Sequence, residues 1–277
     1  MLAGIVTYNP DIDRLNLNVA SIYKQVDRLM VVDNGSNNKE DIKQLCKNFD
    51  NIALLLLSEN YGIAFAQNKI CNYARENGYE WVIILDQDSI CPPNIVAEYN
   101  KYLDYEDIGI LSPRIFDINF GYTEKHFSTN DTDVITDCLA SASAIKISAW
   151  SKVGGFYEPM FIDKVDFDFC FQIRAKGYKV LRINTVELQH EVGHSVRKKF
   201  LFKERSVLNH SPIRYYYMTR NSFLMIKRNG FKIRWISGII INIYGVLRYE
   251  TNKKEKIKYI LLGLYHGITG KKGKYSK

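Results

Sequence analysis

The chain has 277 residues, and its hydrophobic fraction of 46% is ample for the core of a globular protein. This length allows one large domain, or one domain with an appendage. The five cysteines form no C-x-x-C pair, which argues against a zinc site or a disulfide framework and predicts reduced core thiols in a cytosolic protein. An apolar run begins at the second residue, so we expect no signal peptide.

The net charge of +8 is unevenly distributed along the chain. Residues 196–277 contain 20 Lys and Arg against 3 Asp and Glu, whereas residues 1–195 contain 18 against 27. A basic tail on a slightly acidic body favours contact with a polyanion, either nucleic acid or an anionic membrane surface.

Residues 1–112 alternate apolar runs with amphipathic stretches. The predicted strands are Leu2–Thr7, Arg28–Asp33, Ile52–Leu57, Trp81–Asp86 and Ile108–Leu111. The predicted helices are Asp11–Gln25, Lys39–Asn48, Ile63–Asn77 and Pro93–Leu103. This order predicts an α/β fold with a mostly parallel, doubly wound sheet and right-handed crossovers.

Polar or turn-forming residues follow several of the predicted strands. These positions, with one in the following helix, are Thr7, Tyr8, Asn9, Asp33, Asn60, Gly62 and Asn68. Turn formation explains each one singly, but together they mark one sheet edge, where open α/β sheets bind ligands. The sequence therefore predicts a nucleotide crevice, without the glycine-rich loops of Rossmann dehydrogenases or P-loop kinases.

The strand Trp81–Asp86 is the predicted centre of the sheet, because its apolar run suits burial on both faces. It ends in Asp86, and Asp88 follows after one intervening residue. Two acids at a strand end can be explained by a divalent cation held on a diphosphate. The alternative is a solvated turn in which Asp88 or Ser89 caps the next helix.

Residues 113–136 are predicted to form an irregular loop over the crevice. The small side chains of Cys138–Lys146 predict a strand that a ligand can approach closely. A helix from Phe161 to Tyr178 then carries three acids and ends near a glycine cap. These acids are Asp163, Asp166 and Asp168.

Within this predicted helix, the spacing of Asp163 and Asp166 places both on one face, while Asp168 points elsewhere. The helix dipole favours an acid such as Asp163 at the N-terminus. Asp166 lies between Val165 and Phe167, and a carboxylate in an apolar pocket can act as a general base. A lone histidine such as His190 is more often structural, but beside two carboxylates it becomes a candidate metal ligand.

Residues 211–277 are predicted to be helical. The predicted helices are Pro212–Lys227, Ile233–Tyr249 and Lys256–Thr269. The apolar run in the second is shorter than the roughly 20 residues needed to cross a bilayer. Basic amphipathic helices with Trp, Tyr and Ile suit an anionic membrane surface, although they can equally pack on the body or form a homodimer interface.

Several motifs in this order resemble glycosyltransferase family two, inverting enzymes of the GT-A fold, and in particular its bacterial rhamnosyltransferase-like branch. The motifs are Thr7-Tyr8-Asn9-Pro10, Val32–Ser36, Asn60–Ala64, Leu85–Ser89, Phe161–Asp163 with Val165-Asp166, His190 with Gly193, and Tyr215–Tyr217 with Arg220-Asn221. The resemblance covers nearly the whole chain. It implies a GT-A domain over residues 1–210, with a nucleotide-binding half, 1–112, a catalytic and acceptor half, 113–210, and basic amphipathic helices at 211–277.

The resemblance also implies donor contacts. Asp33 would bind the pyrimidine base and Asp86 the ribose side of the nucleotide. Asp88 would bind Mg²⁺ or Mn²⁺ on the diphosphate, with His190 assisting, and Arg220 would approach the leaving diphosphate. The full set of implied nucleotide-sugar contacts is Thr7, Tyr8, Asn9, Asp33, Asn60, Gly62, Asn68, Asp86, Gln87 and Arg220.

For catalysis, the resemblance implies that Asp166 is the base and that Asp168 is a second acid. The chain departs from the branch at Gln172, where arginine is common. The implied reaction transfers a sugar with inversion, favouring L-rhamnose from dTDP-rhamnose, to a surface polysaccharide of the O-antigen or capsule type. The implied location is cytoplasmic, at the inner face of the plasma membrane, where the acceptor can be lipid-linked.

Other functions remain open at this stage. A UDP-hexose or UDP-N-acetylhexosamine donor would leave the fold and mechanism unchanged. A nucleotidyltransferase would want a lysine- and glycine-rich N-terminal loop, which residues 1–14 lack. A non-catalytic protein could bind nucleic acid or membrane through the basic tail, but the long apolar runs of the tail argue against nucleic acid.

Overall fold

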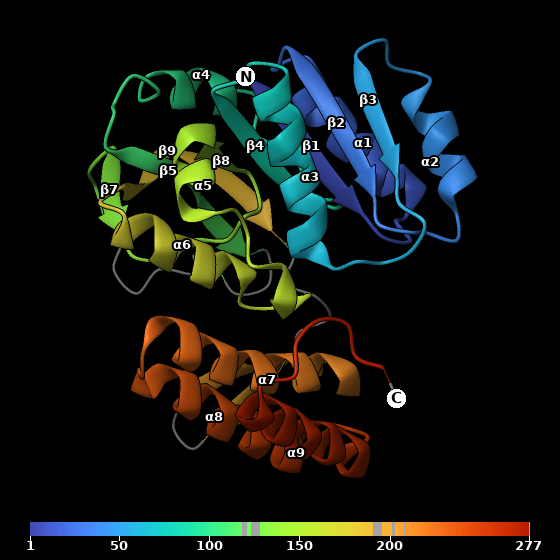
Figure 1. Ribbon diagram of the computed structural model, residues 1–277, viewed down its shortest axis with the longest axis vertical. Coiled ribbons are helices and arrows are strands. Elements are labelled where there is room, and N and C mark those ends of the chain that lie inside the picture. Colours follow the sequence, from blue (N-terminus) through green and yellow to red (C-terminus); the bar gives the residue numbers. More distant parts are fainter. Residues whose placement is uncertain (118–120, 123–127, 191–195, 201–202, 208, 277) are drawn as a thin grey trace.

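The computed structural model describes residues 1–117, 121–122, 128–190, 196–200, 203–207 and 209–276. A twisted sheet with helices on both faces forms one part of the molecule, and a layer of three helices lies beneath it (Figure 1). The described helices are α1 (Ile12–Tyr23), α2 (Lys39–Cys46), α3 (Ile63–Glu76), α4 (Ile95–Asn100), α5 (Ile147–Val153), α6 (Val165–Ala175), α7 (Pro212–Asn229), α8 (Ile233–Tyr249) and α9 (Lys253–Thr269), with a 3₁₀ turn at Glu158–Met160.

The main sheet has the strand order β3-β2-β1-β4-β8-β5-β9-β7, with β6 paired to β5. Its strands are β1 (Leu2–Thr7), β2 (Arg28–Asp33), β3 (Ile52–Leu56), β4 (Trp81–Asp86), β5 (Ile108–Asp117), β6 (Gly121–Tyr122), β7 (Thr132–Ile135), β8 (Ser143–Lys146) and β9 (Lys179–His190). The strands β3, β2, β1 and β4 are parallel, and β8 runs antiparallel between β4 and β5. The predicted α/β fold is confirmed, and the sheet is mixed: its first four strands are parallel, as is the pair β5 and β9, whereas β6, β7 and β8 pair in antiparallel fashion.

Two apolar cores cover the two faces of the sheet. Buried side chains of α1, α2 and α4 pack on one face, and those of α3, α5 and α6 pack on the other. The second core extends to Leu224 and Met225 of α7 and to Trp235 of α8. The helical layer is therefore joined to the sheet part through buried apolar contacts.

The prediction of an irregular loop over residues 113–136 is wrong in part. Strand β5 continues to Asp117, and β7 pairs with β9 at the edge of the sheet. The pairing of β5 with β9 shifts register between Pro113 and Arg114. A proline at a bulge is compatible with a strand, but in the sequence it reads as a strand end. The hairpin of β10 (Val196–Phe200) and β11 (Lys203–Val207) was not predicted either.

The segment before α6 also differs from its prediction. The helix begins at Val165, and Phe161, Asp163 and Lys164 precede it with φ angles of 64°, 67° and 62°. Asp163 is therefore outside the helix and does not share a helical face with Asp166. Positive φ is uncommon for residues other than glycine, so this segment reads in the sequence as a normal helix start.

The helical layer is held together by close packing between α7 and α9. A Cβ atom added at Gly263 would lie 2.6 Å from the carbonyl oxygen of Tyr216, so only glycine permits this approach. Lys256 of α9 and Glu250 form a buried ion pair with a nitrogen-to-oxygen distance of 2.8 Å. Tyr215 donates a hydrogen bond to Glu250, and Lys256 donates another to Asn209. The pair is therefore well satisfied inside the layer.

We expect Lys256→Met to lower the free energy of unfolding by about 3–5 kcal/mol, because it leaves Glu250 buried without its cation. Urea unfolding measures this difference. Lys258→Met is the matched control, since Lys258 is exposed on the same helix and its loss should change little. A double variant, Lys256→Met with Glu250→Gln, should recover much of the stability. Equal effects of Lys256→Met and Lys258→Met would contradict the assignment of a stabilising buried pair.

Candidate active site

The predicted grouping of polar strand ends at one sheet edge is confirmed. Thr7 is paired with Asp33 across β1 and β2, and Val6 is paired with Asp86 across β1 and β4. The Thr7 hydroxyl donates to Asp33 over 3.1 Å, and the backbone N–H of Tyr8 donates to the Gln87 side chain over 2.8 Å. The residues after the three strands therefore meet at one place.

Asp33 shapes this edge from the inside. Its side chain is fully buried, and the backbone N–H of Ser36 donates to its carboxylate over 3.0 Å. The hydroxyls of Thr7 and Ser36 also donate to it. The carboxylate thus serves the turn after β2 and faces no open crevice. The implied contact of Asp33 with a pyrimidine base stays a prediction.

The loop after β3 meets the segment before α6. Gly62 has a φ of 95°, and a Cβ atom there would lie 2.5 Å from the carbonyl oxygen of Phe161. The backbone N–H of Ile63 donates to that same oxygen over 2.7 Å. The Asn60 side chain accepts hydrogen bonds from the Gly62 N–H and the Asn34 amide. Gly62 is therefore required for close backbone approach.

At the end of β4, Asp86 is half-buried and Asp88 is exposed. The Asn18 amide donates to the backbone oxygen of Asp86 over 2.6 Å and so fixes this turn. Within the described ranges, no three His, Cys, Asp or Glu side chains gather into a group that could hold a metal ion. Mg²⁺ is commonly held by only one or two protein carboxylates, with substrate phosphates and water completing its shell. The exposed oxygens of Asp88 fit that type of site.

Asp166 lies in the first turn of α6 and has a pKa raised to about 7. Burial is the main cause, and the nearby charge of Asp86 raises the pKa further. A hydrogen bond from the backbone of Ala140 acts in the opposite direction. A carboxylate with this pKa is suited to accept a proton near neutral pH.

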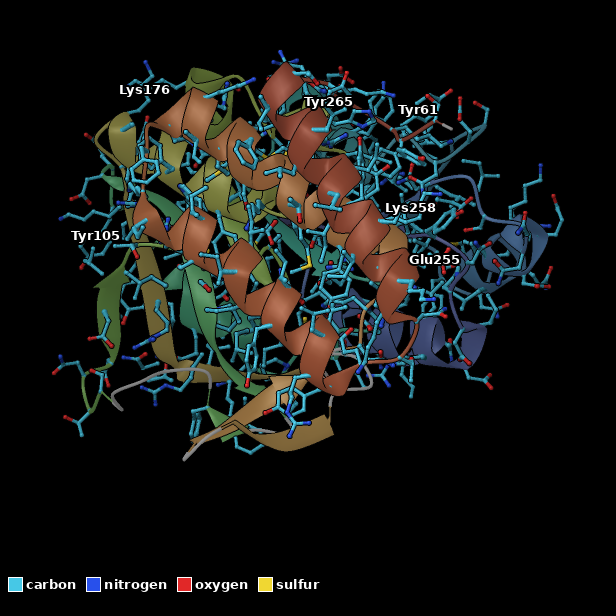
Figure 2. All side chains as sticks on the ribbon, turned by 90° about the horizontal axis from the view of Figure 1, so that it is seen from below. Tyr61, Tyr105, Lys176, Glu255, Lys258 and Tyr265 are labelled. Atoms are coloured by element: carbon cyan, nitrogen blue, oxygen red, sulfur yellow. The ribbon has the colours of Figure 1, made fainter. Side chains whose placement is uncertain are left out.

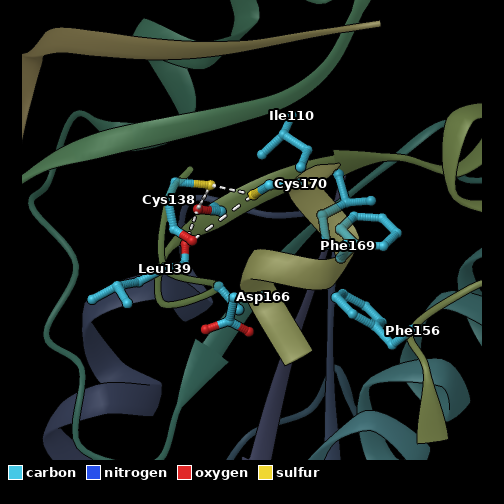
Figure 3. Close-up of a pocket in the computed structure, with 10 residues that line it drawn as sticks. Ile110, Cys138, Leu139, Phe156, Asp166, Phe169 and Cys170 are labelled. Atoms are coloured by element: carbon cyan, nitrogen blue, oxygen red, sulfur yellow. Dashed lines mark hydrogen bonds between the residues drawn. The ribbon is translucent and has the colours of Figure 1, made fainter. Parts of the chain in front are cut away.

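A small apolar pocket adjoins Asp166 (Figure 3). Its lining includes Cys138 and Leu139 before β8, together with Phe169 and Cys170 of α6. The two sulfur atoms of Cys138 and Cys170 lie 3.6 Å apart, and all five cysteines are free. The pocket limits the access of water to one side of Asp166, consistent with the raised pKa of this residue.

Two predicted site residues have structural contacts instead. The Asn68 amide donates to Phe156 and Glu158 and accepts from the Trp150 indole and the Phe156 N–H, so its hydrogen-bonding capacity is filled. Asp168 is 1% exposed and accepts hydrogen bonds from Arg228 and Asn229. The implied donor contact of Asn68 and the implied catalytic acid at Asp168 stay predictions beside these structural contacts.

Arg220 is also placed differently from its implied role. Its side chain is fully buried, and its guanidinium donates to the backbone oxygens of Met160 and Gly273. It therefore binds protein carbonyl groups, and its implied contact with the diphosphate stays a prediction. The side chain of His190 lies outside the described residues.

Exposed polar groups at the edge come from Tyr8 and Asn9, whereas Thr7 is buried. The sequence reasoning assigned no role to Asn221, although its motif was part of the resemblance. Its side chain contacts three backbone oxygens just before α6. The sequence reasoning also missed the backbone of Ala140 and the buried contact of 2.5 Å between the hydroxyls of Ser89 and Ser141. The run of small residues after Cys138 was the available signal for these last two.

Two comparisons relate this chain to known sequences. The model of glycosyl transferase family 2 matches residues 3–179. A dTDP-rhamnosyl transferase, RfbF, from Shigella flexneri is 29% identical over 286 residues, which cover 97% of this chain and 95% of that protein.

Solved structures show the same fold. TarS 1–349 from S. aureus superposes with a TM-score of 0.58 at 13% identity, over 96% of this chain and 80% of that one. Its complex with UDP-GlcNAc gives a TM-score of 0.61 at 13% identity, over 98% and 81% of the two chains. The family model covers more than half of the sequence, so this protein belongs to glycosyl transferase family 2 and is a glycosyltransferase of the GT-A fold.

Proposed function

We propose that this glycosyltransferase moves L-rhamnose from dTDP-rhamnose to a saccharide of a surface polysaccharide, with inversion at the anomeric carbon. The observation that carries the mechanism is Asp166, whose pKa of about 7 suits a general base beside the polar sheet edge. The donor assignment is supported by the relative named as a dTDP-rhamnosyl transferase. A UDP-hexose or UDP-N-acetylhexosamine is the alternative donor. We include it in the test because TarS, which has the same fold, has been solved in complex with UDP-GlcNAc.

In the proposed reaction, the Asp166 carboxylate accepts the proton of an acceptor hydroxyl. The oxygen then attacks the anomeric carbon from the face opposite the diphosphate, and the C–O bond to the diphosphate breaks with its electron pair. One carboxylate base is enough, because the leaving diphosphate needs no proton. Glycoside hydrolysis would require two carboxyl groups on opposite sides of the bond.

Asp88, with Asp86 beside it, would hold Mg²⁺ or Mn²⁺ on the donor diphosphate. The exposed position of Asp88 leaves room for phosphate oxygens and water in the coordination shell. When bound, such an ion supplies positive charge to the departing diphosphate. Asp86 also raises the pKa of Asp166, so the two acids near this edge influence each other.

We further propose that the helical layer binds an anionic membrane surface, where a lipid-linked acceptor would be available. No described helix is long and apolar enough to cross a membrane. The exposed large apolar side chains of α8 are Ile233, Ile240, Ile241, Tyr244 and Leu247. Those of α9 are Leu261, Tyr265 and Ile268. Figure 2 views the molecule from the side of this layer, with Lys258 and Tyr265 of α9 in front.

The residues Ile233, Ile240, Tyr244 and Leu247 recur at helical spacing and so share one face of α8. The helix contains no Asp or Glu, and Arg234 and Arg248 lie near its ends. An apolar face flanked by cations is typical of helices that lie in the interface of an anionic bilayer. The same face could instead pack against a second copy of the chain in a homodimer, and the test below distinguishes the two.

The donor is tested with purified protein, Mg²⁺ or Mn²⁺, and a panel of dTDP-rhamnose, UDP-glucose, UDP-galactose and UDP-N-acetylglucosamine. We expect slow cleavage of dTDP-rhamnose alone. Asp166→Ala should lower kcat by about 10²–10⁴-fold, because the base is removed. Asp88→Ala should raise the metal concentration needed for activity. Asp107→Ala is the control, since Asp107 is an exposed acid paired with Lys179. Preference for a UDP-sugar would refute the rhamnose assignment and leave the mechanism intact.

The pKa of Asp166 also predicts a pH dependence. Because only the ionised carboxylate accepts a proton, kcat should rise with pH through about 7 and then level off. The measurement is kcat for donor cleavage over a buffered pH series. A rate that is constant from about pH 5 to 8 would contradict a raised pKa of Asp166 during catalysis, and the activity of Asp166→Ala would then decide whether this residue is the base.

Whereas kcat should rise with pH, the stability of the folded protein should fall. The folded protein holds the Asp166 proton more tightly than the unfolded chain, so ionisation between the two pKa values lowers stability as the pH rises. We therefore expect Asp166→Asn to raise Tm at about pH 8 and to have less effect near pH 4. Thermal unfolding at both pH values measures this. A Tm of Asp166→Asn below that of the parent protein at about pH 8 would show instead that the ionised carboxylate is stabilising.

Membrane binding is tested by sedimentation with vesicles of phosphatidylglycerol and phosphatidylcholine. Ile240→Glu should abolish binding, because it puts a negative charge on the apolar face of α8. Val134→Glu is the matched control, since Val134 is a 63% exposed apolar residue on the distant strand β7. The alternative outcome is that the parent protein does not bind vesicles and is a dimer in light scattering, whereas Ile240→Glu is a monomer. That result would identify this face as a homodimer interface.

A further inference from the structure

The backbone directly before α6 is strained. Phe161, Asp163 and Lys164 all have φ between 62° and 67°, and none is glycine. Such a conformation is unfavourable for a residue other than glycine and persists only when its surroundings hold it in place. Asp166 follows two residues later, so the conformation of this segment sets where its carboxylate lies.

Asn221 of α7 holds this segment by its backbone. Its side-chain nitrogen lies 3.0 Å from the carbonyl oxygen of Met160, 2.6 Å from that of Ile162 and 2.9 Å from that of Asp163. Arg214, also on α7, forms an ion pair with the Asp163 carboxylate over 2.9 Å. Helix α7 therefore contacts three carbonyl oxygens and one carboxylate in the strained segment.

Arg220 orients Asn221 and adds contacts of its own. Its Nε donates to the Asn221 side-chain oxygen over 3.0 Å, which turns the amide nitrogen toward the segment. One terminal nitrogen donates to the Met160 carbonyl over 2.8 Å, and the other donates to the Gly273 carbonyl over 2.6 Å. The guanidinium is fully buried and lies 4.9 Å from the ring centre of Tyr217. A planar group with several fixed donors suits this task, and lysine would supply only part of it.

The residues after α9 complete the arrangement. The backbone N–H of Gly273 donates to the Pro159 carbonyl over 2.8 Å, and that of Tyr275 donates to the Tyr217 hydroxyl over 2.8 Å. Lys274 forms an ion pair with Glu59 over 2.7 Å, in the loop after β3. This part of the chain thus reaches from the helical layer to the sheet edge.

We infer that Arg220, Asn221 and Gly273 form a positioning group, which holds the strained segment 159–164 so that Asp166 faces the sheet edge. The hydrogen bonds that Arg220 and Asn221 donate to this segment go to backbone oxygens, so the proposed effect on Asp166 acts through the backbone. The inference rests on the proposed role of Asp166 as base, but the contacts themselves can be tested without any activity.

The test uses Gly273→Pro, Arg220→Lys and Arg220→Met in the full chain. Gly273 has a φ of 77°, which proline cannot adopt, and proline also removes the N–H that Pro159 accepts. This variant leaves α7 unchanged, so it remains informative if an Arg220 variant fails to fold. Lys227→Met is the control, because Lys227 of α7 donates to Ile268 and does not contact the segment.

Hydrogen exchange of the Phe161 and Ile162 amides is the first readout. Both donate within the segment, to Glu158 and Met160. We expect exchange at least about tenfold faster in Gly273→Pro and Arg220→Met, an intermediate rate in Arg220→Lys, and the parent rate in Lys227→Met. Parent-like exchange in Gly273→Pro and Arg220→Met would overturn the inference, whatever the donor assays give.

Donor cleavage is the second readout. A displaced base should lower kcat by about tenfold to a hundredfold while the donor KM stays within about twofold, because Asp86 and Asp88 at the sheet edge are not substituted. Faster exchange with an unchanged kcat would show a structural role alone and would also overturn the inference. If the parent protein cleaves no donor, the proposed function fails, and the exchange data still decide whether the group holds the segment.

Discussion

The site depends on one physical constraint, the burial of the Asp166 carboxylate close to the charge of Asp86. Two carboxylates that influence each other in a partly buried place resist carrying two charges at once. Burial is the main reason that the pKa of Asp166 rises to about 7, and the charge of Asp86 adds to it, while a hydrogen bond from the Ala140 backbone and the charge of Arg214 offset part of the rise. The protein thus gives up some stability at alkaline pH to keep a carboxylate that can take a proton near neutrality.

The layers of the molecule serve this arrangement in different ways. The parallel strands β1, β2 and β4 bring the polar edge together, because their carboxyl ends must lie side by side. The antiparallel strand β8 follows Ala140 and so carries its backbone to Asp166. The helical layer contributes from below, where Asn221 and Arg220 contact the backbone before α6. Sheet and helices therefore meet at the same carboxylate.

The fold and the sequence of this protein are shared to different degrees with known proteins. TarS shares the fold at 13% identity, whereas the Shigella flexneri relative is 29% identical across almost the whole chain. A fold survives wide sequence change because it needs only the apolar pattern of strands and helices. The polar residues at the strand ends are a smaller set, and their chemistry is what can differ between donors.

The sequence by itself determined the four parallel strands β1 to β4 and the polar edge where they end. The apolar runs and turn residues around Thr7, Asp33 and Asp86 have local causes, so pattern reasoning found them. The sequence also predicted Asp166 as a base, since its aromatic neighbours indicated burial. It did not predict that β5 passes through Pro113 or that Asp163 lies outside the helix, because a bulge and positive φ depend on tertiary partners.

Only the tertiary structure decided what the remaining polar side chains do. Asn68, Asp168 and Arg220 have side chains that could bind a ligand. In the structure each makes hydrogen bonds to segments that are distant in the sequence. A side chain with several donors or acceptors can serve a ligand or the protein, and its type and spacing are the same in both cases. The choice depends on which backbone oxygens or charges arrive beside it when the chain is folded.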